Sequence, residues 1–527
     1  MKTRVDRTGW LVVAAAFGLV LPSCAFRVKV REEWNDRSRK PIELTEASRV
    51  WETVRGGESP DKAGLAAYNK AVRRTVVQIG DNWATSKEEL AALHTSEGEV
   101  YLRVCSVNVD AVESLEEIVP ADFLKIRRGF RSESAVEGLG ASLLVKQVRT
   151  EADPMIPATG LWYPVTAVLN LDQPAKPVLA LLDPTKRGKL HFAGREFPLS
   201  ANYTAALARD LNDRQFQFER ISGLLSFEKF ADRIGLYRAT AFDPAKRPCL
   251  FVHGVKSSPT TWNETINRLY GVEAVRERYE FWHFGYPTGA SIPYMASRLR
   301  ESIREMVEFR RSQGAPDAPI TLIGHSMGGL LAKGVTVSSG EAEWNQLFTV
   351  PLDELPMSEQ GREILRKMIY FEPVEEVERV IFCATPHRGS KLAENPAARL
   401  LVDLIDLPSY LTQLSTGILN YGTDALTPLG MEFTRDRITS IEQLSPKARI
   451  TSEFLNKPLN PEVSYHSIIG NQSPSRVPLE KSSDGVVVYS SSHLDGVDSE
   501  LVIPGSDHGV HRNDAGIAEI IRILLLP

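Results

Sequence analysis

The sequence predicts an α/β fold with a mostly parallel central sheet in its C-terminal half, and three observations lead to this prediction. From about residue 236 onward, short apolar runs rich in β-forming residues are separated by polar loops. One such run, residues 320–323, passes through a glycine-rich turn straight into a helix-compatible run at 330–333. A final amphipathic pattern at about 514–526 predicts a closing helix. Alternating strands and helices of this kind favour a parallel sheet.

The turn after residues 320–323 carries the strongest functional signal. It reads Gly-His-Ser-Met-Gly at 324–328 and fits the G-x-S-x-G pattern of a nucleophile elbow. In such a turn the serine backbone is strained, and the flanking Gly324 and Gly328 leave room where a Cβ would clash with neighbouring chain. The pattern predicts that Ser326 is exposed at the carboxyl end of its strand as a catalytic nucleophile. The alternative is an ordinary glycine-rich turn.

A serine nucleophile needs a base, and the base needs an orienting acid. Residues 463–470 and 500–503 read as strands, and the loops that follow them contain Asp484 and His508. The chain order serine, acid, histidine is the one that accompanies a G-x-S-x-G elbow. We therefore expect Asp484 and His508 to complete a triad with Ser326.

Other residues compete for these roles. His511 lies three positions after His508 and is an alternative base. Asp507 is an alternative acid, although a residue adjacent to the base rarely points back at its ring. Asp484 followed by glycine also fits a simple turn. His466 lies inside a predicted strand and fits a packed core residue, and His325 fits a structural part of the elbow.

The tetrahedral intermediate also needs hydrogen-bond donors for its oxyanion. An apolar strand at 248–252 ends in His253 and Gly254, and a glycine here lets the backbone approach the substrate. The backbone amides of Val255 and Met327 are the predicted donors. His253 is expected to fix this loop rather than to act as a base.

Taken together, these segments resemble a bacterial lipase or esterase of the α/β-hydrolase superfamily. They are also similar to the lipase-like enzymes that deacylate glycolipid anchors. The likeness is carried by His253-Gly254, the turn at 324–329, the Ala-Thr-Pro-His-Arg-Gly-Ser stretch at 384–390, residues 483–487 and the histidine loop. It covers about residues 236–527. It implies the α/β-hydrolase fold and the triad Ser326, Asp484 and His508, and it does not extend to residues 25–235.

The N-terminus predicts export. A basic start precedes an apolar run at 10–21, which is too short for a bilayer core that needs about 20 residues. We expect residues 1–24 to be a signal peptide. Cys24 resembles the acylated cysteine of a bacterial lipoprotein, although Pro22 departs from that pattern, and cleavage after Ala25 is the alternative. The expected location is the cell envelope through lipidated Cys24, or otherwise the periplasm or the medium.

Composition narrows the function classes. A net charge of −5, spread along 527 residues, gives no electrostatic case for nucleic-acid binding. The four cysteines form no spaced pair, and no cluster has the spacing of metal ligands, so neither a metal nor a cofactor is expected. Cys249 and Cys383 fall at strand positions and are expected to be buried thiols. Nothing in the sequence predicts an oligomeric state.

We expect three parts: the signal, an accessory region at 25–230 and the catalytic domain at 231–527. The accessory region reads as helical at 42–95 and β-rich at 98–205. Its strands fit either a separate small sheet or an extension of the hydrolase sheet. Within the catalytic domain, an insertion at 391–461 carries apolar residues over more than one helical face. This pattern fits a lid over an acyl groove or an ordinary cap helix.

The expected reaction is a two-step acyl transfer to water through an acyl-enzyme, with an acyl ester or lipid as substrate. An acyltransferase on the same triad is an alternative, because the same acyl-enzyme serves both reactions. A non-catalytic envelope-binding protein on a hydrolase scaffold is a third reading. It predicts a damaged triad or oxyanion loop, and neither is evident in this sequence.

Overall fold

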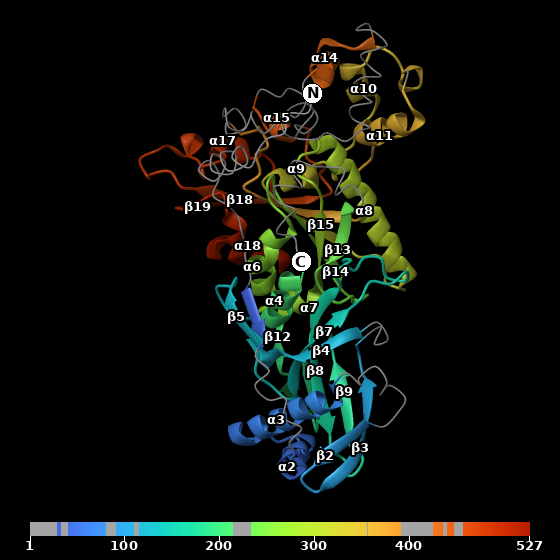
Figure 1. The fold of residues 1–527 in the computed structure, drawn as a ribbon. Helices are drawn as coiled ribbons and strands as arrows, with labels where there is room; N and C mark the ends of the chain where they lie inside the picture. The colour runs from blue at the N-terminus through green and yellow to red at the C-terminus, as the bar shows by residue number, and fades with distance from the viewer. Residues whose placement is uncertain are drawn as a thin grey trace, which may run out of the picture.

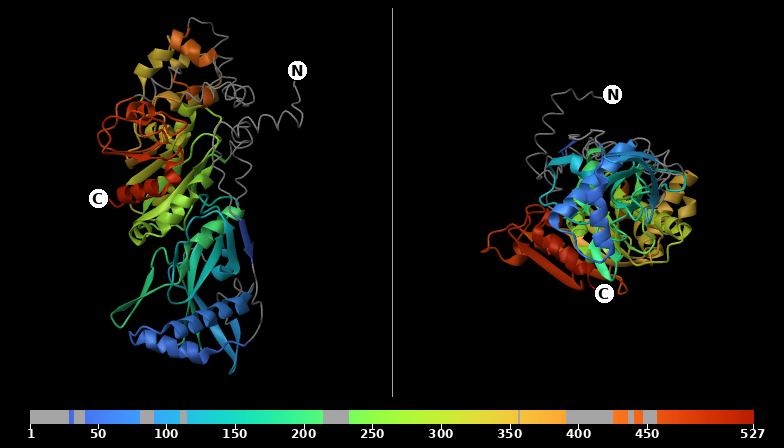
Figure 2. Two further views of the ribbon diagram at one scale, coloured as in Figure 1. Left: turned by 90° about the vertical axis from the view of Figure 1, so that its left-hand side faces the viewer. Right: turned by 90° about the horizontal axis from the view of Figure 1, so that it is seen from below.

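The computed structural model describes residues 29–32, 41–80, 91–109, 115–213, 233–355, 357–390, 425–435, 440–446 and 457–527. These residues form two units stacked end to end (Figures 1 and 2). The accessory region lies at one end, and the unit formed by the described residues from 233 onward, called the hydrolase unit after the predicted fold, lies at the other. The predicted signal, Cys24 and most of the 391–461 insertion lie outside the described residues. Within the described part of the chain, no helix combines the length and apolarity that a membrane crossing requires.

The hydrolase unit is built on a seven-stranded sheet in the order β13-β15-β14-β16-β17-β18-β19. Its strands are β13 (Gly235–Arg238), β14 (Arg247–Val252), β15 (Tyr279–Gly285), β16 (Ile320–His325), β17 (Val377–Cys383), β18 (Ser464–Asn471) and β19 (Ser499–Pro504). Five of the six neighbouring pairs are parallel, and only β13 runs antiparallel to its neighbour β15. The prediction of a mostly parallel sheet is therefore confirmed.

Helices cover both faces of this sheet, and alternate residues of β17 show how. Phe382 belongs to the same apolar cluster as residues of α8 (Ile292–Ser312) and α9 (Met327–Lys333). The next residue, Cys383, belongs to the cluster that contains α6 (Asn263–Tyr270) and α18 (Asp514–Leu524). Successive strand residues point to opposite faces, so the sheet is buried on both sides.

The accessory region has a sheet of its own, so it does not extend the hydrolase sheet. Its six strands run in the order β2-β3-β9-β8-β7-β4. They are β2 (Ala91–Thr95), β3 (Gly98–Ser106), β4 (Leu115–Pro120), β7 (Ala141–Gln147), β8 (Leu161–Asn170) and β9 (Val178–Leu182). The helices α2 (Leu44–Arg55) and α3 (Lys62–Ile79) share one apolar cluster with one face of this sheet, and α4 (Tyr203–Asp213) shares another cluster with Leu144 and Trp162.

One boundary of the sequence-based prediction is wrong. The helical segment expected at 42–95 ends with α3 at Ile79, and Ala91–Thr95 forms strand β2. Strand β2 pairs antiparallel with β3, from Ala91 opposite Leu102 to Thr95 opposite Gly98. Within it Leu93 is buried and both its neighbours are less so. This segment is a strand because it pairs with β3 across a tight turn, and the helical periodicity of the sequence does not reveal such a pairing.

The described chain contains further strands and α-helices. They are β1 (Lys29–Glu32), β5 (Leu124–Arg128), β6 (Ala135–Val136), β10 (Lys189–Phe192), β11 (Arg195–Pro198), β12 (Ala201–Asn202), α7 (Glu273–Arg278), α10 (Glu341–Leu347), α11 (Glu359–Ile369), α14 (Pro428–Arg435), α15 (Ser440–Gln443) and α17 (Tyr489–Ser492). In the views of Figures 1 and 2, α10, α11 and α14 lie at the end of the molecule opposite the accessory region.

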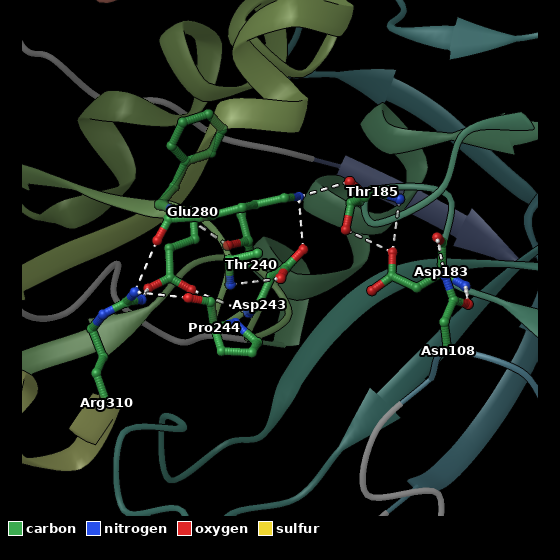
Figure 3. A network of polar contacts seen from close by, with 11 residues as sticks. Asn108, Asp183, Thr185, Thr240, Asp243, Pro244, Glu280 and Arg310 are labelled. Carbon is green, nitrogen blue, oxygen red and sulfur yellow. Dashed lines mark hydrogen bonds and ion pairs between the residues drawn. The ribbon is translucent and has the colours of Figure 1, made fainter. Parts of the chain in front are cut away.

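A polar network joins the two units at the amino ends of the hydrolase strands (Figure 3). Lys246, just before β14, donates from Nζ to the carbonyl oxygen of Thr185 at 2.7 Å, and the Thr185 hydroxyl donates to Asp183. On the hydrolase side, buried Arg310 pairs with buried Glu280 and donates to the Lys246 carbonyl oxygen at 2.8 Å. The accessory region is thereby held at the sheet edge opposite the carboxyl end of β16, where Ser326 lies.

Candidate active site

Ser326 follows β16 directly and has a strained backbone. Its φ is 54° and its ψ is −124°, in a region that residues with a side chain rarely occupy. The backbone is fixed on both sides of this residue. The Ser326 amide donates to the Cys383 carbonyl oxygen at 2.8 Å, and the Gly329 amide donates to the Ser326 carbonyl oxygen at 3.0 Å. This is the geometry expected of a nucleophile elbow between a strand and a helix.

The two glycines of the motif are required by close backbone packing. A Cβ added to Gly328 would lie 2.3 Å from the carbonyl oxygen of Val252 and 2.5 Å from that of His253. A Cβ on Gly324 would lie 2.5 Å from the Gly329 Cα. All of these neighbours are backbone atoms, so they cannot move aside as a flexible side chain would.

We expect Gly328→Ala to lower the free energy of unfolding by about 1–3 kcal/mol, because the added methyl group overpacks a rigid backbone crossing. Urea unfolding followed by circular dichroism measures this change. Gly235→Ala is the matched control, since the nearest atom to a Cβ there is 3.9 Å away. Equal stability of the two variants would contradict the packing explanation.

Asp484 and His508 are brought together as a hydrogen-bonded pair. Nδ1 of His508 lies 2.7 Å from Oδ2 of Asp484, whose side chain is buried. The other carboxylate oxygen, Oδ1, accepts the amides of Val486 and Val487 at 2.8 and 2.7 Å. The carboxylate is therefore fixed from both sides. Because Nδ1 faces the carboxylate, Nε2 is the ring nitrogen left to serve a reacting group.

Gly470 allows the acid loop and the base loop to meet. It lies near the end of β18, and a Cβ there would lie 2.6 Å from the Asp507 carbonyl oxygen and 3.0 Å from the Asp484 Cβ. A larger residue would push the two loops apart. Sequence reasoning did not single out Gly470, although a glycine close to the end of a strand was an available signal.

His325 connects the nucleophile to the other two loops. Its Nε2 lies 2.9 Å from the carbonyl oxygen of His508, which can only accept, so Nε2 carries the proton. A Cβ added to Gly254 would lie 3.1 Å from the His325 carbonyl oxygen and 2.9 Å from the Ser326 Cβ. The base loop and the predicted oxyanion loop therefore both touch the elbow. Sequence reasoning assigned His325 a structural role without naming this contact.

The competing residues are engaged elsewhere. His511 is fully buried, its Nε2 bonds to the Thr261 hydroxyl at 2.9 Å, and burial holds its pKa well below the usual value. Asp507 accepts the Gly509 amide at 2.9 Å through Oδ1. Gly485 has a φ of 92°, so Asp484 does sit in a turn and also binds His508. His466 bonds to the Ser499 hydroxyl at 2.8 Å, and burial lowers its pKa to about 4.

The predicted oxyanion loop begins at His253, which is held in place on both sides. Its ring stacks on Tyr286 with centroids 4.3 Å apart, and its carbonyl oxygen accepts the Tyr286 hydroxyl. Burial lowers the pKa of His253 to about 4, so the ring is neutral near pH 7. Met327 opens α9, where the first amides have no acceptor within the helix. Val255 follows Gly254, the residue that lies against Ser326.

The stretch at 384–390 ties the strand after the elbow to the acid loop. The Ser390 hydroxyl donates to the Val486 carbonyl oxygen at 2.6 Å. Arg388 donates to the carbonyl oxygens of Ser490 and His493 at 2.9 and 2.6 Å. The segment therefore braces the loop that carries Asp484. Among the residues that the structure describes, no cluster of three His, Cys, Asp or Glu side chains has an arrangement suited to a metal ion.

Five of the buried histidines should make folding sensitive to acid. Burial is the largest cause of the lowered pKa of each of these rings. The pKa falls to about 4 for His253 and His466. It falls well below the usual value for His325, His387 and His511. Histidine in an unfolded chain titrates near 6.5, so below that pH the unfolded chain binds more protons than the folded protein. The free energy of unfolding should therefore fall as pH decreases from about 6.5 towards 4, by up to about 1.4 kcal/mol per pH unit for each histidine.

Urea unfolding at several pH values between 7 and 5 measures this slope. In His511→Gln the slope should be shallower by up to about 1.4 kcal/mol per pH unit, because one buried titrating ring is lost. A free energy of unfolding that stays constant over this range in the parent protein would contradict the assignment of neutral buried rings.

One protein family matches the central part of the chain. Residues 245–417, or 173 of 527, match the family described as "Putative serine esterase (DUF676)". The matched segment includes strand β14 and the turn that carries Ser326, while Asp484 and His508 lie beyond its end. The resemblance to lipases and esterases of the α/β-hydrolase type is confirmed at this level. The comparison with curated proteins gives no match.

Solved structures of bacterial lipases and esterases are similar to part of the chain. Bacillus licheniformis lipase BlEst2 in its propeptide form is 18% identical over 55% of this chain and 52% of its own, with a TM-score of 0.33. A lipase-esterase related protein from Clostridium acetobutylicum is 17% identical over 55% and 99%, with a TM-score of 0.29. Staphylococcus hyicus lipase is 15% identical over 53% and 96%, with a TM-score of 0.31. These identities and scores are too low to bear on activity.

Proposed function

We propose that this protein is a serine ester hydrolase that uses Ser326, His508 and Asp484 as a catalytic triad. The observation that carries the proposal is the pairing of His508 with Asp484 at 2.7 Å. The loop of His508 is hydrogen-bonded to His325, the residue next to the strained Ser326. A buried acid, an oriented imidazole and an elbow serine are the parts that activate a hydroxyl for acyl transfer. The family match supports a serine ester hydrolase at the level of enzyme class.

The proposed reaction has two steps. His508 accepts the Ser326 proton as the serine oxygen attacks the ester carbonyl, and Asp484 stabilises the resulting imidazolium. The amides of Val255 and Met327 hold the oxyanion. His508 then gives its proton to the leaving alcohol, the C–O bond to that alcohol breaks, and an acyl-enzyme remains. Water, deprotonated by His508, attacks the acyl-enzyme and releases the acid and Ser326.

We further propose that the insertion at 391–461 caps the site and shapes the acyl pocket. Its described parts support this placement. The Ser440 hydroxyl donates to the Thr288 carbonyl oxygen, and the Gln443 side chain accepts the Ile292 amide at 2.6 Å. At α14, a Cβ on Gly430 would lie 1.9 Å from the Leu347 carbonyl oxygen, so this helix packs closely on the end of α10. Export, with or without lipidation of Cys24, is part of the same proposal.

A chain-length series of p-nitrophenyl esters tests the proposed function. We expect hydrolysis of these esters and its loss after treatment with a fluorophosphonate, which phosphonylates activated serines. Hydrolysis that continues unchanged after such treatment would contradict a serine mechanism. The absence of hydrolysis across the whole series would contradict an esterase of simple acyl chains.

A further inference from the structure

A buried lysine lies beside the proposed site and plays no part in the proposed reaction. Lys333 ends α9, seven positions after Ser326, and its side chain is 1% exposed. Among the described residues, no acidic side chain pairs with its ammonium group. Burial first, and the nearby Arg388 second, lower its pKa to about 8. The amine is therefore mostly charged near pH 7, and a buried charge normally has a partner of opposite sign.

The direction of this side chain follows from the helix. Side chains on a helix tilt towards its N-terminus, so Lys333 runs back over Gly329, one turn earlier. Gly329 lies against the loop after β17, because a Cβ there would be 1.9 Å from the Thr385 hydroxyl oxygen. The ammonium group is thereby directed towards the loop that contains Thr385 and His387, and the charge of Lys333 acts on His387.

The loop that Lys333 faces also carries buried polar groups that have no partner among the residues described by the structure. His387 is 5% exposed, and neither of its ring nitrogens makes a hydrogen bond with these residues. Its ring packs edge-on against Phe382, with centroids 4.7 Å apart. The Thr385 hydroxyl is likewise buried and bonds to none of the described residues. Buried polar groups are nearly always satisfied, so three such groups in one place require an explanation.

We propose that Lys333, His387 and Thr385 form a binding site for an anionic oxygen group, a carboxylate or a phosphate, next to the nucleophile. The ammonium supplies the charge, while an imidazole N–H and a hydroxyl supply further donors. Arg388 is not a member of the site, since its guanidinium donates to the carbonyl oxygens of Ser490 and His493. No acidic residue is needed to complete the site, because the ligand brings the negative charge.

This site suggests a substrate class, and that part of the inference rests on the proposed function. Seven residues of helix separate the Cα atoms of Ser326 and Lys333 by about 10 Å along the axis, and the Lys333 side chain runs back over part of this length. An ester whose acyl chain is several carbons long and ends in an acidic group could place its carbonyl at Ser326 and its anion at Lys333. The same chemistry would also hold a free anion such as inorganic phosphate, so the experiment has to separate the two sources.

The first arm compares two esters of equal length. One is the mono-p-nitrophenyl ester of a dicarboxylic acid, and the other is the same compound with its acid capped as a methyl ester. We expect Lys333→Met to lower the ratio of kcat/KM for the anionic over the neutral ester by about 10- to 100-fold, the range for loss of a hydrogen bond to a charged group. His387→Phe, which keeps an aromatic ring against Phe382, should lower the same ratio.

The matched control is Lys146→Met, in which a lysine paired with Glu116 at 2.9 Å is lost in the accessory region, outside the site. This control should leave the ratio as in the parent protein. The second arm measures Tm with and without inorganic phosphate. A phosphate-dependent rise in Tm that is present in the parent protein and absent from Lys333→Met supports the site directly and needs no catalytic activity.

The outcomes distinguish a site for a substrate anion from a site for a free anion. A lower ester ratio supports a substrate anion, and a phosphate effect alone supports a site for a free anion. An unchanged ratio in both site variants, together with an equal phosphate response in parent and variant, would overturn the site. If the parent protein hydrolyses neither ester, the proposed function fails, and the Tm arm still decides whether the anion site exists.

Discussion

Replacing Ser326 with alanine should lower kcat for p-nitrophenyl ester hydrolysis by about 10⁵- to 10⁶-fold, the loss seen when a serine hydrolase loses its nucleophile. The strained backbone at Ser326 is held by the Cys383 carbonyl oxygen and by the Gly329 amide, and alanine keeps both contacts. The variant should therefore stay folded while it loses the oxygen that forms the acyl-enzyme.

Steady-state kinetics on one short-chain ester measures this loss, and urea unfolding checks the fold. Ser312→Ala is the matched control, since that hydroxyl donates to the Phe309 carbonyl oxygen at the end of α8. This end of α8 lies at the amino ends of the strands, where Arg310 contacts Lys246. A Ser326→Ala variant that keeps a tenth or more of the parent kcat would show that another group is the nucleophile.

Asp484→Asn should lower kcat by about 10⁴-fold, the size of the effect when the triad acid of a serine protease becomes an amide. The structure gives a specific reason. Oδ1 of Asp484 accepts the amides of Val486 and Val487, so an asparagine would keep its oxygen there and turn its NH₂ group towards His508. An NH₂ group cannot accept from Nδ1–H, so the imidazole would adopt the tautomer with its proton on Nε2, which cannot take the proton from Ser326.

Stopped assays at several pH values check this prediction, because a wrong tautomer lowers kcat at every pH where the base is neutral. Asp507→Asn is the control, since its carboxylate accepts only the neighbouring Gly509 amide among the contacts that the structure describes. A larger loss in Asp507→Asn than in Asp484→Asn would exchange the roles of the two acids.

Local patterns account for what the sequence could predict. The elbow at 324–328 is a contiguous motif, so it could be recognised from the sequence alone. Gly324 is required by Gly328 and Gly329 within the same turn, whereas Gly328 is required by the backbone of Val252 and His253 at the end of β14. The pairing of Asp484 with His508 was predicted from chain order, because parallel strands bring their carboxyl-terminal loops to one sheet edge.

The features that the sequence could not predict depend on contacts between segments that are distant in the chain. Strand β2 takes its identity from its pairing with β3, and Gly470 is required only because two loops cross there. The same holds for the accessory region, whose own sheet could not be told from an extension of the hydrolase sheet by strand patterns. Its position at the amino ends of the hydrolase strands depends on contacts such as Lys246 with Thr185.

That position also narrows the search for specificity. The accessory region meets the hydrolase unit at the amino ends of the strands, through Lys246 and Thr185, whereas Ser326 follows the carboxyl end of β16. Substrate choice is better sought in the proposed cap, which includes α14, and in the proposed anion site formed by Lys333, His387 and Thr385.

The proposed mechanism requires Ser326 to be the activated nucleophile. Labelling the intact protein with a fluorophosphonate, followed by digestion and mass spectrometry, identifies the residue that reacts. The proposal predicts a single adduct on Ser326 that forms in step with the loss of ester hydrolysis and does not form in Ser326→Ala. An adduct on another residue that forms in step with the loss of activity, or full inactivation of the protein with Ser326 unmodified, would contradict it.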